Sequence, residues 1–174
     1  MDYSSEFLNA FERVIGHEGK YQREYKDRGN WTSGIVGRGE LKGTKFGISA
    51  MSYPELDIEH LSLEQARAIY YQDFWLKIGG RQRHAVMYQL FDAAINHGTS
   101  RAVQFLQRAV GSNDDGHYGP KTQAALLEAD PNDVLLCFLA ERLDFMNNLS
   151  AWATFSRGWS QRIAENLRYA ALDN

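Results

Sequence analysis

Glu18 and Asp27 are two acidic residues whose types and spacing are suited to acid catalysis. Glu18 follows an apolar stretch, where desolvation would raise the pKa of its carboxyl group, whereas Asp27 lies in the polar segment KDRGNW and should stay ionised. Cleavage of a glycosidic bond uses such a pair, because one carboxylic acid protonates the leaving oxygen while a second carboxylate stabilises positive charge or activates water. The chain has 22 acidic residues, so two ordinary surface acids are the alternative interpretation.

The segments around these two acids predict a helix followed by a small lobe of loops. Residues 4–18 carry apolar side chains at helical spacing, namely Phe7, Phe11, Val14 and Ile15. Glu18 therefore falls near the end of this helix, and Gly19 can stop it. Residues 19–49 contain seven of the 15 glycines, which favours irregular loops and short hairpin strands. A hairpin can fold Asp27 back to face Glu18 in a cleft between two unequal lobes.

Helical patterns dominate the chain from residue 62 onward. Ser62 and Gln65 form a capping box before one helix, residues 83–96 carry a helical pattern, and Thr99 can cap the next helix. Asp130 with Pro131 opens a helix to about residue 147, and a last helix is expected from about Phe155 to Leu172. We therefore predict a mainly α (α+β) protein with one domain over residues 1–174. Its small lobe is expected at about residues 19–50, and its helical lobe comprises residues 1–18 and 51–174.

Composition and charge exclude several classes of function. A chain of 174 residues with 44% hydrophobic residues can bury one substantial core. The net charge of −3 argues against a dedicated nucleic-acid binder. The five histidines lack metal-ligand spacing, and no phosphate loop or nucleophile elbow is present, so we expect neither a metal nor a cofactor. Cys137 lies in the apolar run VLLCFLAERL and is expected to be a buried thiol.

The basic residues are unevenly distributed along the chain. Residues 17–48 carry seven Lys or Arg against four Asp or Glu, which is typical either of a solvated loop or of a basic rim that attracts an anionic polymer. The amino terminus has no basic region followed by an apolar region, and no stretch is as long as a membrane span. We therefore expect a soluble chain made in the cytoplasm, without stable membrane insertion.

Three sequence boxes carry a resemblance to a known family. The segments FERVIGHEGKY, KDRGNW and GTKFGIS resemble the glycoside hydrolase 108 family of phage and bacterial N-acetylmuramidases, whose pattern includes an EGGY box, a DxGG turn and a TxYGIS box. The resemblance implies a lysozyme-like fold. It also implies that Glu18 is the general acid, Asp27 the second acidic member, and Thr44 a hydroxyl that holds water or substrate.

Two departures from the family pattern lie inside these boxes. Lys20 replaces the second glycine of the EGGY box, so this position does not need a positive φ. The loop NWTSGIVGRGELKG is longer than the family pattern and leaves Thr32 as a rival to Thr44 for the hydroxyl role. The TKFGIS context favours Thr44.

Further candidate residues would bind the substrate. The aromatic residues Tyr21, Trp31 and Phe46, with Tyr25, lie near the acids in sequence and can stack on sugar rings, although each can equally be a core residue. The resemblance extends to FDAAINHG, which implies that Asn96 and His97 line the cleft. Capping of helix carbonyls is the alternative role of these two polar residues.

A later segment, at about residues 98–128, resembles peptidoglycan-binding helical modules. Its matching positions are Asp115, Gly116, Tyr118, Gly119 and Thr122. The segment is too short for a core of its own, so we expect helices built into the large lobe. These residues would either touch the glycan or form a purely structural turn.

The resemblance implies a peptidoglycan hydrolase that cleaves the β-1,4 bond between N-acetylmuramic acid and N-acetylglucosamine, with inversion by direct attack of water. It further implies a monomeric phage endolysin that binds glycan strands, accumulates in the host cytoplasm and reaches the cell wall at lysis through a holin pore. Two alternatives remain at this point. A lytic transglycosylase would also use one helix-end glutamate, and a non-catalytic cell-wall-binding or virion structural module would use neither acid.

Overall fold

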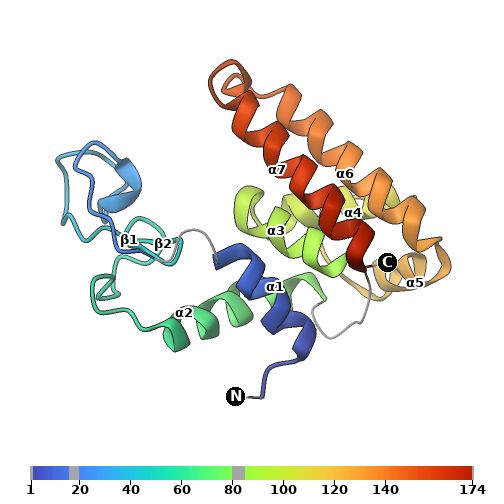
Figure 1. Cartoon of the computed structure of the whole chain (residues 1–174), viewed down its shortest axis with the longest axis horizontal. Helices are drawn as coiled ribbons and strands as arrows, with labels where there is room; N and C mark the ends of the chain where they lie inside the picture. The colour runs from blue at the N-terminus through green and yellow to red at the C-terminus, as the bar shows by residue number, and fades with distance from the viewer. Residues whose placement is uncertain (1, 16–19, 80–84, 174) are drawn as a thin grey trace. The chain divides into compact units, whose positions relative to one another are not determined.

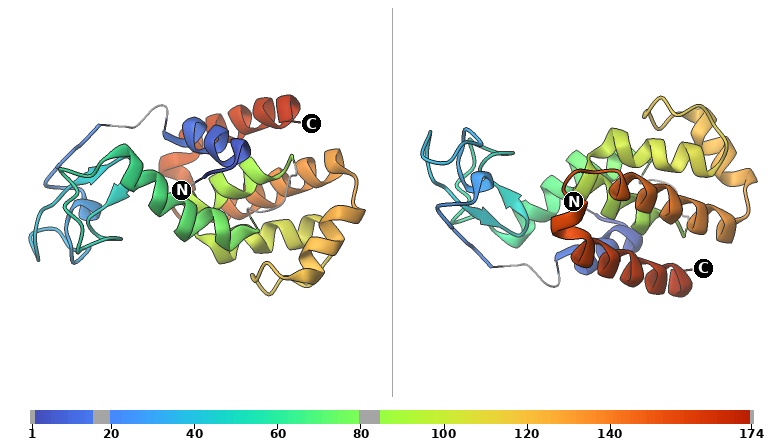
Figure 2. Two further views of the ribbon diagram at one scale, coloured as in Figure 1. Left: turned by 90° about the horizontal axis from the view of Figure 1, so that it is seen from below. Right: turned by 90° about the horizontal axis from the view of Figure 1, so that it is seen from above.

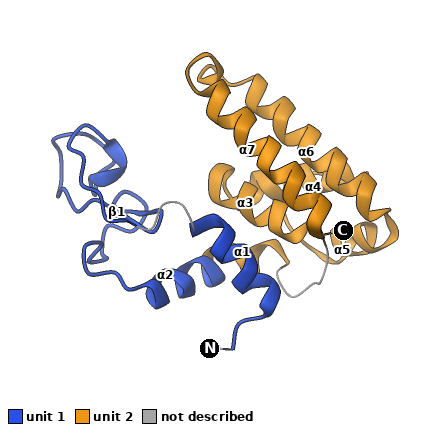
Figure 3. Ribbon diagram, in the orientation of Figure 1, with its two compact units in different colours: residues 1–72 blue, residues 73–174 orange. Residues whose placement is uncertain are grey.

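The chain forms two compact units, residues 1–72 and residues 73–174 (Figure 3). The structure, a computed structural model, describes residues 2–15, 20–79 and 85–173. Glu18 and Gly19, which the sequence places at the end of the first helix, lie outside the described residues. The sequence analysis grouped the first helix with the later helices, whereas here it belongs to the same unit as the glycine-rich segment. The assignment of one catalytic domain with two lobes stays a prediction.

The first unit combines two helices with a short hairpin (Figure 1). Its elements are α1 (Ser5–Ile15), η1 (Arg28–Asn30), β1 (Thr44–Lys45), β2 (Ile48–Ser49) and α2 (Leu63–Tyr70). Helix α1 buries Phe7 and Phe11, as its apolar spacing predicts, and the Phe11 ring packs edge-on against Tyr70 at 5.7 Å between centroids. The Ser62 side chain and Gln65 form the predicted capping box at the start of α2.

The first unit contains a short hairpin, and the extended chain around Gln22 pairs with the first strand of this hairpin. Strands β1 and β2 are antiparallel, with Thr44 opposite Ser49, and Gln22 forms an isolated antiparallel bridge to Thr44. Gly43 precedes β1 with a φ of 86°, and a Cβ there would lie 2.5 Å from the carbonyl oxygen of Gln22. Only glycine fits this approach. The expected loops and short hairpin strands are therefore confirmed.

The second unit is helical (Figure 2). Its elements are α3 (Met87–His97), α4 (Thr99–Ala109), α5 (Pro120–Glu128), α6 (Pro131–Asn147), α7 (Trp152–Asp173) and the short η3 (Leu76–Ile78), while η2 (Tyr71–Trp75) spans the boundary between the units. Helix α3 is buried along residues 87–94, and α6 and α7 run side by side. The mainly α prediction is confirmed. Among the described residues, no helix is both long and apolar enough to cross a membrane.

Two local predictions in the second unit are wrong, and a third is confirmed. Asp130 caps α6 as predicted, through its carboxylate and the backbone N–H groups of Asn132 and Asp133. Thr99 is the first residue of α4 rather than its cap, because the chain turns at Gly98 with a φ of 85°. Cys137 is exposed rather than buried. The buried stripe of α6 runs through residues on the opposite side, so an apolar stretch in sequence did not mean burial at every position.

The segment that resembles a peptidoglycan-binding module is organised by one buried side chain, Gln107. Its amide nitrogen donates to Asp115 Oδ1 at 2.8 Å and Thr122 Oγ1 at 3.0 Å, and its amide oxygen accepts from Gly116 N at 2.8 Å. Gly116 has a φ of 76°, whereas Gly119 is extended and does not require glycine. These contacts give the motif a structural role, and glycan binding by it stays a prediction.

Substitution of Gly43 by alanine tests whether the close approach of Gln22 to the hairpin supports the first unit. We expect Gly43→Ala to lower the free energy of unfolding by about 2–4 kcal/mol, because the new methyl group meets backbone. Gly111→Ala is the matched control, since Gly111 has a φ of 67° with nothing within 4 Å, and should cost about 1 kcal/mol. Urea unfolding followed by tryptophan fluorescence measures both. Equal losses would show that the contact with Gln22 contributes nothing.

Candidate active site

Asp27 stands at the start of η1 with its carboxylate held in one orientation. Its Oδ1 accepts a hydrogen bond from Gly29 N at 2.8 Å, so Asp27 is the cap of this short helix. Its Oδ2 accepts from Gln22 Nε2 at 3.2 Å. Asp27 is exposed, and among the described residues each carboxylate oxygen accepts one hydrogen bond and can accept another. The carboxylate is therefore positioned but still available to a substrate or to water.

A fully buried amide, that of Asn30, lies next to Asp27 and connects it to Thr44. Asn30 Nδ2 donates to Gln22 Oε1 at 2.7 Å and to the carbonyl oxygen of Glu24 at 2.9 Å. Asn30 Oδ1 accepts from Gln22 Nε2 at 3.1 Å and from Thr44 Oγ1 at 2.8 Å. Gln22 thus bonds to both Asp27 and Asn30. The four side chains of Gln22, Asp27, Asn30 and Thr44 form one hydrogen-bonded cluster, which we call the Asp27–Thr44 cluster.

The two candidate threonines have different surroundings. Thr44 is half-buried, and its hydroxyl donates within the Asp27–Thr44 cluster. The Thr32 hydroxyl instead accepts a hydrogen bond from the backbone N–H of Glu40 at 3.0 Å, where it stabilises the long loop. The structure brings Asp27 and Thr44 together through Gln22 and Asn30. Gln22 and Asn30 were missed by the sequence analysis, and no local signal marks them, because their pairing depends on how the loop folds back.

Two of the three predicted aromatic residues have defined contacts through their polar groups. The Tyr21 hydroxyl donates to the carbonyl oxygen of Lys42 at 3.2 Å, and its ring lines a pocket. Trp31 is only 8% exposed, and its Nε1 donates to the carbonyl oxygen of Tyr25 at 2.9 Å. Tyr25 covers this indole with an edge-on ring and is itself 56% exposed. Trp31 is therefore a core residue of its loop, and the contact of these rings with sugars stays a prediction.

Phe46, the third aromatic candidate, forms the turn of the hairpin. It is half-buried with a φ of 52°, a conformation that a bulky residue seldom adopts. The side chain of Tyr70 supports this turn, since its hydroxyl donates a hydrogen bond to the carbonyl oxygen of Phe46 at 3.0 Å. The cationic Nζ of Lys45 lies 5.5 Å from the centre of its ring. Its proposed role in sugar binding is untested by these contacts.

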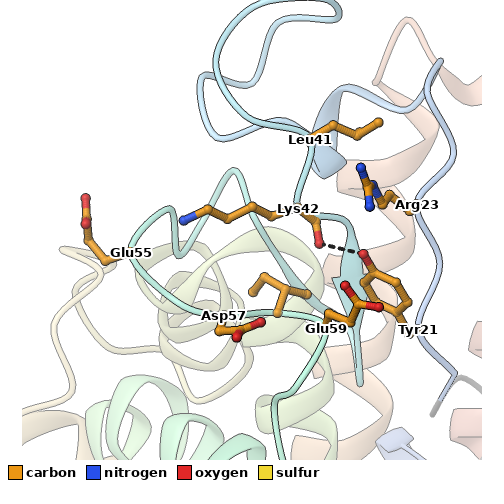
Figure 4. A pocket seen from close by; sticks show the side chains of 8 residues that line it. Tyr21, Arg23, Leu41, Lys42, Glu55, Asp57 and Glu59 are labelled. Atoms are coloured by element: carbon orange, nitrogen blue, oxygen red, sulfur yellow. Dashed lines mark hydrogen bonds between the residues drawn. The ribbon is translucent and has the colours of Figure 1, made fainter.

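A pocket of about 360 Å³ lies in the first unit (Figure 4). Its lining residues are Tyr21, Arg23, Leu41, Lys42, Glu55, Asp57, Ile58 and Glu59. Two of its charges are already engaged: Lys42 Nζ donates to the carbonyl oxygen of Pro54 at 2.6 Å, and Asp57 Oδ2 lies 3.0 Å from His60 Nδ1. The pocket therefore presents charges of both signs beside the aromatic ring of Tyr21.

The other predicted binding residues, Asn96 and His97, end helix α3 in the second unit. Asn96 Nδ2 donates to the carbonyl oxygen of Asp92 at 2.6 Å. This bond is the capping of a helix carbonyl that the sequence offered as the alternative role of Asn96. His97 Nε2 accepts from Arg142 Nε at 3.1 Å, and its ring lies edge-on to Phe105 and Phe145. Asn96 therefore bonds within α3, His97 contacts α4 and α6, and the contact of both with glycan stays a prediction.

A buried ion cluster around Asp92 fixes these helices. Asp92 is 1% exposed and accepts hydrogen bonds from Arg142 at 2.6 Å, Arg162 at 2.6 Å and Asn166 at 2.9 Å. Burial alone would raise the pKa of the Asp92 carboxyl group, but the two guanidinium groups outweigh it and lower that pKa to about 2. Burial and the Arg142 charge lower the pKa of His97 to about 4. His97 is therefore a neutral acceptor at neutral pH.

The neutral state of His97 makes stability depend on pH. Between its unfolded pKa of 6.5 and its folded pKa of about 4, the unfolded chain binds a proton that the folded chain does not. Stability should therefore fall as pH drops through this window, by up to about 3 kcal/mol before solvent screening. The Asp92 contribution persists until the pH falls from about 4 toward about 2.

His97→Gln tests this pH dependence, because glutamine can still accept from Arg142 but does not titrate. We expect its urea midpoint to change less between pH 6.5 and pH 4 than that of the unmodified protein. His117→Gln, at an exposed position, should keep the full dependence. Parallel pH profiles for all three proteins would contradict the assignment of the acid sensitivity to His97.

The comparison with solved structures agrees with this fold. The chain resembles the solved structure of SagA from Brucella abortus, with a TM-score of 0.80 and 27% sequence identity over 97% of this chain and 96% of that chain. No curated protein matches the chain. The fold is that of a lysozyme-like protein, mainly helical with a small hairpin.

The family follows from the sequence match. Residues 11–98 match the family model Glycosyl hydrolase 108, and the chain belongs to this family of glycoside hydrolases. The matched range contains the Asp27–Thr44 cluster and the pocket, and it ends at Gly98, before α4.

Proposed function

We propose that this glycoside hydrolase cleaves the β-1,4 bond between N-acetylmuramic acid and N-acetylglucosamine in peptidoglycan. The observation that carries the proposal is the Asp27–Thr44 cluster, in which a carboxylate and a hydroxyl are joined by the buried amide of Asn30 and the amide of Gln22. The family match supports glycoside hydrolysis, and the cluster supplies groups that can orient water. Glycan strands of peptidoglycan are the proposed partner.

In the proposed reaction, Glu18 protonates the leaving glycosidic oxygen while water attacks the anomeric carbon from the opposite face. Thr44 already donates its proton to Asn30, so its oxygen is left to accept a hydrogen bond from that water. Asp27 accepts the other hydrogen and takes the proton as the new carbon–oxygen bond forms. Both hydrogens of the water are then held, which directs its lone pair toward the sugar. A single displacement of this kind inverts the anomeric centre.

The amide pair explains how these groups can stay in place during turnover. Each Gln22 and Asn30 amide has its polar atoms engaged, so neither side chain can rotate without losing several hydrogen bonds. Preorganised donors and acceptors contribute to catalysis because they do not need to reorient at the moment of reaction. We place this enzyme at the host cell wall as a monomeric phage endolysin released through a holin, in keeping with its resemblance to phage muramidases.

Glu18→Gln tests the proposed acid. We expect lysis of chloroform-treated Gram-negative cell walls, followed as turbidity loss, to fall by about a hundredfold or more, because the amide cannot protonate the leaving oxygen. Glu12→Gln, at an exposed position of α1, is the matched control and should keep the activity.

Mass spectrometry of the fragments released by the unmodified protein completes this test. Reducing N-acetylmuramic acid ends are expected, whereas anhydro ends would indicate a lytic transglycosylase. Undiminished lysis by a folded Glu18→Gln variant would remove Glu18 as the acid. Absence of lysis by the unmodified protein would favour the non-catalytic binding module.

Thr44→Val and Thr32→Val separate the two candidate hydroxyl groups. Valine keeps the shape of threonine but cannot bind water, so Thr44→Val should lower kcat by about tenfold to a hundredfold. Thr32→Val removes only the acceptor for Glu40 N and should leave kcat within about threefold. Thr44→Ser should recover most of the loss. A larger effect at Thr32 than at Thr44 would reverse the assignment.

A further inference from the structure

The extended segment 21–23 has two chemically different faces. Gln22 pairs with Thr44 through backbone hydrogen bonds of 2.9 Å and directs its amide into the Asp27–Thr44 cluster. Side chains alternate along an extended chain, so the neighbours of Gln22 project to the other face. There Tyr21 and Arg23 line the pocket described above (Figure 4). The pocket and the cluster therefore lie on opposite faces of one short segment.

Three charged side chains that line this pocket, those of Arg23, Glu55 and Glu59, have no partner among the described residues. Among the described residues, the side chains of Arg23 and Glu59 make no hydrogen bond and no ion pair, with each other or with a neighbour. In Figure 4 the Arg23 guanidinium and the Glu59 carboxylate lie on either side of the Tyr21 hydroxyl. The Glu59 backbone is fixed, because its carbonyl oxygen accepts from Lys45 Nζ at 2.7 Å. Arg23 is thus a free donor for a carboxylate, and Glu59 a free acceptor for an ammonium group.

We infer that this pocket binds the peptide stem of peptidoglycan, through an amino acid that carries both a free carboxylate and a free ammonium group. Arg23 binds the carboxylate, and Glu59 binds the ammonium group. The inference rests on the proposed function for its choice of substrate. It adds a recognition site for the side branch of that substrate, separate from the groups that act on the glycan.

Size and reach fit a peptide branch better than the glycan itself. A volume of about 360 Å³ is at the small end of ligand pockets and suits one amino-acid residue rather than several sugar rings. An extended stem of four residues spans at most about 14 Å, which is enough to pass from one face of a single extended segment to the other. A carboxylate and an ammonium group would form ion pairs with Arg23 and Glu59, respectively, which uncharged sugar hydroxyl groups cannot do.

A metal ion fits this pocket less well than a zwitterion. No group of three His, Cys, Asp or Glu side chains among the described residues is arranged to hold a metal. The free cation of Arg23 and the free anion of Glu59, on either side of the Tyr21 hydroxyl, are complementary to an amino acid, whereas Glu55 lies apart from that hydroxyl in Figure 4.

Binding of the free stem peptide tests the inference without any reference to cleavage. The probe is the tetrapeptide L-alanyl-D-glutamyl-diaminopimelyl-D-alanine, titrated by calorimetry into the intact protein. We expect Arg23→Gln and Glu59→Gln each to weaken binding by about tenfold, because each removes one charge-assisted contact. Arg38→Gln and Glu128→Gln remove exposed charges outside the pocket and should leave the affinity unchanged. A peptide with blocked amino and carboxyl groups should not bind.

Hydrolysis rates then separate this inference from the proposed function. On peptide-bearing glycan, the two pocket variants should lose about tenfold in kcat/KM, while on glycan stripped of its peptides by an amidase they should match the unmodified enzyme. Absence of tetrapeptide binding, or an equal loss on both substrates, would overturn the stem site and leave the hydrolase standing. Stem binding by a protein that cleaves neither substrate would support the site and overturn the proposed function.

Discussion

The buried amide of Asn30 is the interaction on which the first unit depends. Burial of an amide without hydrogen bonds costs several kcal/mol. Asn30 is fully buried, but this cost is avoided because each polar atom of its side chain is hydrogen-bonded. Its backbone carbonyl oxygen also accepts from Lys42 N and Gly43 N. One residue therefore joins the extended segment around Gln22, the turn that begins at Asp27 and the start of the hairpin. Among the described residues of this unit, the sheet has two strands of two residues each, and the contacts of Asn30 join segments that the sheet does not pair.

In the second unit, a buried polar group is stabilised by ion pairs rather than by amide hydrogen bonds alone. Asp92 is buried between two arginines, and the ion cluster connects α3 with α6 and α7. A buried carboxylate is tolerated only when paired and hydrogen-bonded, and Asp92 has both compensations. The consequence for His97 is a ring held neutral by burial and by the neighbouring guanidinium of Arg142. The polar groups of this cluster are thus engaged with one another, whereas the Asp27 carboxylate is exposed and open to a ligand.

The functional proposals share one short stretch of chain. Gln22 orients the groups proposed to hold the attacking water, and its neighbours Tyr21 and Arg23 line the pocket assigned to the peptide stem. A substrate that carries a peptide branch on a glycan strand presents both features to such a segment. Recognition of the branch would then position the bond to be cleaved, in the way that remote binding contacts support catalysis in other enzymes.

The sequence by itself determined the features that depend on near neighbours. Helix periodicity, the Ser62 capping box, the Asp130 cap and the glycine-rich hairpin segment each involve residues a few positions apart, and their energies do not need the rest of the fold. The family resemblance singled out Asp27 and Thr44. The tertiary structure alone decided that Asn30 joins them, that Arg142 reaches His97 across 45 positions, and that Cys137 faces outward. Contacts of this kind depend on the path of the chain between distant residues, because composition and spacing state which groups are available but not which ones meet.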